Sequence, residues 1–178
     1  MNIRLVKPSE EHREEWYAII KEMEDANEKI TPLALKCNAE NYDIFLKNAR
    51  DIAEGKNLTE GFVSADIYFL VDFNGRILGA IDIRHELNEY LLNYGGNIGY
   101  GVRPSERKKG YATEMLRLAL DICKKRKMDR VLVTCFKSNI GSAKTILKNG
   151  GSLENEILDG DELKQRYWIK MKLIQKGE

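Results

Sequence analysis

The sequence has few cysteines, few prolines and almost no excess of charge of either sign. Its three cysteines, Cys37, Cys123 and Cys135, are odd in number and far apart, and no C-x-x-C pair occurs. They predict neither a disulfide framework nor a thiolate zinc site. We therefore expect reduced thiols in a cytoplasmic protein with no bound metal.

Basic and acidic side chains nearly balance, 29 against 28, which leaves a net charge of +1. A nucleic-acid-binding protein usually carries a clear basic surplus, so we do not expect a nucleic-acid partner. No apolar run approaches the length of a membrane span, and residues 1–6 lack the apolar core of a secretory signal. We therefore expect no membrane partner either.

The length of 178 residues, 43% of them hydrophobic, predicts one domain with a sizeable core over residues 1–178. Apolar runs and alternation predict strands over 3–6, 67–73, 77–83, 97–102, 131–136, 152–158 and 166–173. Apolar steps of three and four predict helices over about 9–23, 39–53, 111–127 and 139–149. The order mixes hairpins with helical crossovers, which indicates an α+β fold with a mixed sheet.

The first predicted helix has an acidic outer face, formed by Glu11, Glu14, Glu15, Glu22 and Asp25. That face suits a cationic substrate, but an ordinary solvated helix face is the simpler interpretation.

The segment 107–113 carries the most functional information. It follows a strand-like run and opens a strongly periodic helix, with Gly110 in the connecting turn. Such a turn exposes unpaired backbone N–H groups at the positive end of a helix dipole. This geometry binds phosphate, and in this arrangement a diphosphate.

Three phosphate-binding motifs can be compared with the sequence of this turn. No G-x-x-x-x-G-K-[ST] sequence occurs, which excludes a P-loop. Gly99 and Gly101 begin a G-x-G-x-x-G pattern, but Pro104 stands in the third position and both glycines fall inside the strand. The remaining pattern, R-x-x-G-x-A, is matched by Arg107, Gly110 and Ala112.

With this motif the chain resembles the GCN5-related N-acetyltransferase (GNAT) superfamily. A second motif, Asn139 with Ser142 three residues later on a helix that ends at Lys148-Asn149-Gly150, is also similar to that family. The resemblance extends over about 1–173. It implies a mostly antiparallel sheet of six to seven strands, flanked by about four helices and split near the fourth strand.

The resemblance also implies acetyl-CoA as acyl donor. The diphosphate would lie on the turn and the pantetheine arm beside the strand 98–102, like an added strand. Gly99 and Gly101 would allow its close approach, although a bulge or tight packing also explains Gly99. The residues expected at the cofactor are Tyr100, Gly101, Val102, Arg107, Lys108, Lys109, Gly110, Tyr111, Ala112, Thr113, Asn139 and Ser142. Asn139 is also a good helix N-cap.

The family's usual catalytic side chains are absent. Many relatives place a tyrosine acid four residues after the serine, where this chain has Ile146. Others place a glutamate base where Gly96 and Asn97 stand. The polar segment 82–89 supplies the candidate bases His85 and Glu86, for which a solvated loop with a local ion pair is an equal alternative.

We therefore expect an acetyl-CoA-dependent N-acetyltransferase (an acyltransferase) that works by direct attack of an amine in a ternary complex. The alternative is a non-catalytic acyl-CoA-binding or sensing module. The acceptor, a small-molecule amine or a protein amine, should bind in a groove between the first two helices and the segments 56–64 and 85–96. Homodimer formation is left open.

Overall fold

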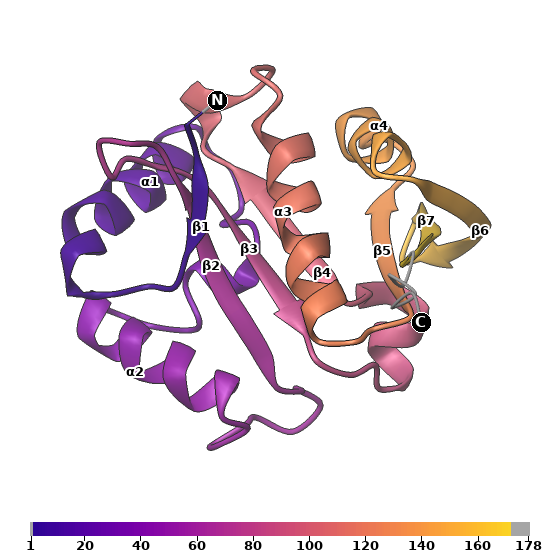
Figure 1. Cartoon of the computed structure of the whole chain (residues 1–178), viewed down its shortest axis with the longest axis horizontal. Helices are drawn as coiled ribbons and strands as arrows, with labels where there is room; N and C mark the ends of the chain where they lie inside the picture. Colours follow the sequence, from indigo (N-terminus) through magenta and orange to yellow (C-terminus); the bar gives the residue numbers. More distant parts are fainter. Residues whose placement is uncertain (1, 172–178) are drawn as a thin grey trace, which may run out of the picture.

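The computed structural model describes residues 2–171 and contains one seven-stranded sheet of order β1-β2-β3-β4-β5-β7-β6 (Figure 1). The strands are β1 (Arg4–Val6), β2 (Ala65–Val71), β3 (Ile77–Arg84), β4 (Ile98–Val102), β5 (Arg130–Phe136), β6 (Gly151–Asp159) and β7 (Glu162–Lys170). The α-helices are α1 (Arg13–Asp25), α2 (Tyr42–Ala53), α3 (Tyr111–Lys125) and α4 (Ile140–Lys148). Short 3-10 turns η1 (Glu10–His12), η2 (Leu33–Leu35) and η4 (Pro104–Glu106), and the π turn η3 (Leu91–Gly95), connect them.

The sheet is antiparallel throughout except between β4 and β5, which run parallel. These two strands share one register pair, Ile98 with Val133, and then separate. Asn97 holds them together just before they part, because its backbone N–H donates to the carbonyl of Leu132 and its side chain accepts from the Leu132 N–H. The predicted α+β fold with a mixed, mostly antiparallel sheet split at the fourth strand is confirmed.

Each face of the sheet has its own hydrophobic core. Along β2, Ile67 and Phe69 pack toward α1 and α2, whereas Tyr68 and Leu70 pack toward α3, as period-two alternation requires. Figure 1 shows α1 and α2 on one side of β2 and β3 and α3 on the other. Among residues 2–171, no helix is both long and apolar enough to cross a membrane.

Local hydrogen bonds explain why two element boundaries differ from the predicted ones. Helix α2 begins at Tyr42 rather than at 39, because the side chain of Asn41 accepts from the Ile44 N–H as an N-cap. Strand β2 ends before residue 73, because the Asp72 carboxylate accepts two turn amides and Phe73 is exposed.

The last strand was predicted from 166 to 173. Strand β7 begins earlier, at Glu162, since the tight turn at Gly160, with a φ of 64°, pairs Asp159 directly with Glu162. The predicted end at 173 lies outside the described residues.

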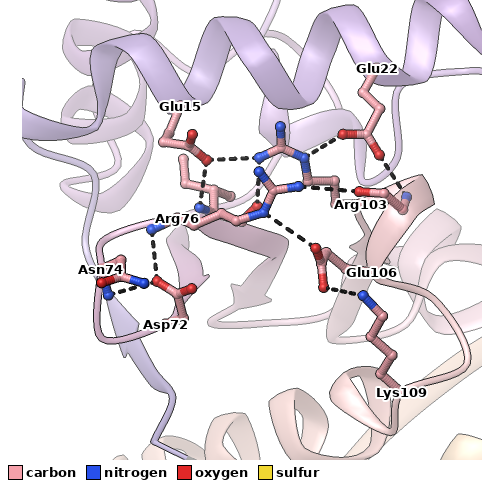
Figure 2. Close-up of polar contacts among 10 residues, drawn as sticks. Glu15, Glu22, Asp72, Asn74, Arg76, Arg103, Glu106 and Lys109 are labelled. Atoms are coloured by element: carbon pink, nitrogen blue, oxygen red, sulfur yellow. Dashed lines mark hydrogen bonds and ion pairs between the residues drawn. The ribbon is translucent and has the colours of Figure 1, made fainter.

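The acidic face of α1 is only partly solvated, contrary to the simpler interpretation. Glu15 and Glu22 bind the buried guanidinium of Arg103 at 2.7 and 2.5 Å, at the end of β4 (Figure 2). Glu22 also accepts from the Ser105 N–H at 2.6 Å, and Glu106 pairs with Lys109. This network fixes the chain between β4 and α3, where the phosphate-binding turn was predicted.

Candidate active site

The turn before α3 presents a row of backbone N–H groups. Lys108 and Gly110 both have positive φ, 61° and 87°, and α3 begins immediately afterwards at Tyr111. No acceptor within residues 2–171 takes a hydrogen bond from the amides of 108–113, whereas the next amide, that of Glu114, binds the Gly110 carbonyl. Unpaired donors at the start of a helix are suited to binding an anion, and the binding of a diphosphate here remains a prediction from the sequence.

The basic side chains of the turn differ in their surroundings. Arg107 forms a two-point ion pair with Glu28, at 2.7 and 2.5 Å, and donates through Nε to the Val102 carbonyl. Lys109 pairs with Glu106 at 2.9 Å, and Lys108 is exposed. Arg107 therefore ties the turn to β4 and to the segment that follows α1, and Lys108 is available to contact a ligand.

The split between β4 and β5 brings Tyr100 and Ser142 together. Their hydroxyl oxygens are 2.7 Å apart, and the side chain of Asn139 accepts from the Ser142 N–H at the start of α4. Burial raises the pKa of Tyr100 to about 12, so its phenol keeps its proton at neutral pH. The phenol of Tyr100 thus provides a hydroxyl donor near the split. Ile146, at the position where many relatives have tyrosine, is buried in the core.

Gly99 and Gly101 of β4 face away from Tyr100, and on that face of the sheet other residues of the same chain lie against them. A Cβ at position 101 would lie 2.1 Å from the carbonyl oxygen of Thr31, in the segment between α1 and η2. A Cβ at position 99 would lie 2.7 Å from Oδ1 of Asp82. Both glycines therefore permit a close approach, but on this face the partners are Thr31 and Asp82.

A cavity of about 810 Å³ opens on that same face. It is lined by residues of η2, α2, β2, β3 and the segments 37–38, 57–63 and 88–91. The cavity overlaps the predicted acceptor groove at α2 and at the last two segments, but no residue of α1 lines it. Three exposed apolar side chains contribute to its lining: Leu33, Phe62 and Tyr90. Its size suits a small ligand or the end of a peptide.

His85 and Glu86 do not line this cavity. Nε2 of His85 lies 3.1 Å from Oδ2 of Asp66, which also binds Lys7 and Arg126, and Glu86 is exposed. The structure thus places His85 in an ion cluster beside β2. A role as base for either residue remains a prediction from the sequence.

Among the charged side chains that line the cavity, the most deeply buried is Asp82, on β3. It is 2% exposed, and its Oδ2 lies 3.1 Å from Nη2 of Arg84. Its Oδ1 has no hydrogen-bond partner among the described residues. Sequence reasoning missed it, although a signal existed: an aspartate inside the otherwise apolar run 77–83.

The comparisons with known proteins agree with this architecture. No curated protein matches the chain in sequence. Among solved structures, RimL, a ribosomal L7/L12 alpha-N-protein acetyltransferase in complex with coenzyme A, has 15% identity and a TM-score of 0.70, over 96% of this chain and 95% of that one. The microcin C7 self-immunity acetyltransferase MccE, in complex with acetyl-CoA and AMP, has 19% identity and a TM-score of 0.66, over 96% and 93%.

A spermidine N-acetyltransferase from Vibrio cholerae, a dodecamer, has 14% identity and a TM-score of 0.64, over 95% and 94%. Identities this low show a shared fold. The family itself is shown by a sequence profile described as acetyltransferase (GNAT) domain, which matches residues 2–152. The chain therefore belongs to the GNAT family of acetyltransferases, whose acetyl donor is acetyl-CoA.

Proposed function

We propose that the protein transfers an acetyl group from acetyl-CoA to an amine by direct attack in a ternary complex. One observation carries this proposal: α3, whose first amides are unpaired, packs on one face of the sheet, and the cavity beside Asp82 opens on the other face, next to the part of β4 that β5 leaves free. A donor and an acceptor bound on these two faces would meet in the split. Holding both reactants in this way supplies much of the rate enhancement of a direct transfer.

The donor is held mainly by backbone groups in this proposal. The amides of 108–113 bind the diphosphate, with Lys108 as the nearby cation. The pantetheine arm follows the edge of β4 that β5 leaves free beyond Ile98, as an added strand would. Two of the structural neighbours hold coenzyme A or acetyl-CoA, which supports this choice of donor.

The same edge supplies donors for the oxyanion of the tetrahedral intermediate. The Asn97 carbonyl accepts from the Arg84 N–H, and the Arg103 N–H donates to the Leu78 carbonyl, so both groups point toward β3. Since antiparallel pairing alternates along a strand, the N–H groups of Tyr100 and Val102 point toward the split. An N–H fixed there would stabilise the negative charge that develops on the thioester oxygen.

Tyr100 is the proposed proton donor to the leaving thiolate. As the amine nitrogen attacks, a C–N bond forms, the C–S bond breaks and its electron pair goes to sulfur. The phenol of Tyr100 then protonates the sulfur, and the proton that the nitrogen loses after attack balances the one the sulfur gains. Ser142, hydrogen-bonded to Tyr100, orients the phenol.

The acceptor is a primary amine on a small molecule or on a protein, bound in the cavity. Neighbours of this fold include enzymes for both classes, a spermidine acetyltransferase and a ribosomal-protein acetyltransferase. The test is thiol release from acetyl-CoA with a panel of alkylamines, arylalkylamines, polyamines and peptide α-amines, with product masses measured. Acetylated product is expected. Binding of CoA without turnover of any amine would instead favour a binding or sensing module.

A further inference from the structure

We infer that Asp82 receives the ammonium group of the acceptor and removes its proton before the attack. This inference rests on the proposed N-acetyltransferase function and names the acceptor's chemical class. It assigns to one buried carboxylate the role of base, for which the sequence offered His85 and Glu86.

The carboxylate of Asp82 is held by one of its two oxygens. Arg84 contacts Oδ2 at 3.1 Å and is itself fixed, because its Nη1 donates to the carbonyls of Gly95 and Gly96, each at 3.1 Å. The other oxygen, Oδ1, is buried without a partner among the described residues. A buried carboxylate oxygen without a donor is costly, so a site that keeps one is suited to a ligand that supplies the donor.

The unpaired oxygen lies where the thioester is expected. Asp82 stands opposite Gly99, which is the first residue of β4 beyond its pairing with β5. Because Gly99 has no side chain, Oδ1 can lie against the backbone of β4 itself. An amine hydrogen-bonded to Oδ1 would therefore be within reach of a thioester that follows the same strand edge.

The cavity around Asp82 selects for positive charge on an apolar body. Its lining contains four carboxylates and two basic side chains, namely Asp51, Glu60, Asp82, Glu89, Lys47 and Arg84. The lining is thus negative overall, and three exposed apolar side chains, Leu33, Phe62 and Tyr90, stand among its polar residues. These features fit a primary alkylammonium or arylalkylammonium.

The charged and titratable neighbours of Asp82 are compatible with proton uptake. Burial raises the pKa of the Asp82 carboxyl, although the adjacent Arg84 opposes this. Burial, together with the charge of Asp82, also raises the pKa of Cys37 to about 12, so this thiol stays neutral. The carboxylate takes one proton from the ammonium, the neutral nitrogen attacks, and the proton is later released to water through the cavity.

The experiment compares the wild type with Asp82→Asn, using hexylamine and phenethylamine as probes. At pH 7 an amine of pKa about 10 is almost fully protonated, so Asp82→Asn should lose roughly 100-fold in kcat/KM. At about pH 9.5 much of the amine is already neutral, and the variant should recover most of this loss. The rise in Tm on adding CoA should be unchanged, and Asp121→Asn, on the exposed face of α3, is the matched control.

Three results would overturn the inference. Turnover of Asp82→Asn close to that of the wild type at pH 7 would remove Asp82 from the reaction and leave the proposed function standing. An equal loss at both pH values would show a structural role only. If the wild type acetylates no amine although CoA raises its Tm, the proposed function fails and the inference with it.

Discussion

Asp82 and Gly99 face each other across β3 and β4, and the missing side chain of Gly99 makes room for the carboxylate. A Cβ at position 99 would lie 2.7 Å from Oδ1 of Asp82 and 3.2 Å from Nη2 of Arg84. Neither group can keep its place once a methyl group is added. The proposed base is therefore positioned by the strand along which we propose that the donor binds.

The variant Gly99→Ala should displace the Asp82 carboxylate and slow acetyl transfer. A displacement of about 1 Å at a reacting group costs on the order of 100-fold in rate, and we expect a loss of this size in kcat/KM. Steady-state kinetics with hexylamine measure it.

The control for this variant is Gly75→Ala, in the β2–β3 turn. Gly75 has a φ of 84°, and a Cβ there would meet nothing within 4 Å. Alanine at this position costs only backbone strain, about 1–2 kcal/mol of stability, without touching the cavity. If Gly75→Ala lowered kcat/KM as much as Gly99→Ala does, the loss would come from reduced stability and not from displacement of the Asp82 carboxylate.

The variant Gly110→Asp should lose CoA binding and keep the fold. An aspartate at the N-cap of α3 would accept hydrogen bonds from the first helical amides and place a negative charge beside the diphosphate. We expect the rise in Tm with CoA to disappear. Gly110→Asn, which adds the same bulk and tolerates positive φ without charge, should keep part of it. Equal CoA affinity in Gly110→Asp and the wild type would argue against this site.

The variant Tyr100→Phe should lower kcat and leave the affinity for CoA nearly unchanged. The lost phenol would no longer protonate the thiolate, a contribution of about 100-fold or more for general acids. Because the pKa of Tyr100 is raised to about 12, the wild type should show no loss from ionisation of this phenol between pH 7 and the ordinary Tyr pKa of about 10. A Tyr100→Phe variant with normal kcat at pH 7 would contradict the role.

Protonation of Glu22 should make the free energy of unfolding depend on pH in the acid range. Burial alone would raise its pKa, but hydrogen bonds from Arg103 and Ser105 outweigh burial and lower the pKa to about 2, from an ordinary value of 4.5. The stabilisation is therefore complete above about pH 4.5 and is lost as the pH falls toward 2. Glu22→Gln should lower the free energy of unfolding at pH 7 and flatten its decline below pH 4.5, as urea titrations would show. The exposed Glu14→Gln on the same helix should change neither.

Local patterns in the sequence were enough for most of the fold. The Asn74-Gly75 pair predicted the β2–β3 hairpin, and apolar steps of three and four predicted α3, because turn chemistry and helical periodicity act between near neighbours. The R-x-x-G-x-A motif likewise predicted the turn before α3. Boundaries such as those of α2 and β7 were missed where a single cap or turn decided them.

Short-range patterns were sufficient to predict the fold, the family and the turn proposed to bind the donor, since each pattern lies within a short stretch of the chain. Only the tertiary structure showed that Asp82 lies against Gly99, that Tyr100 reaches Ser142 and that Glu15 and Glu22 hold Arg103. These contacts join residues from different elements, and sheet register and helix packing decide which of them meet. Arg84, two residues along the same strand, holds one oxygen of Asp82, but the role proposed for the other oxygen depends on the strand that folds beside it.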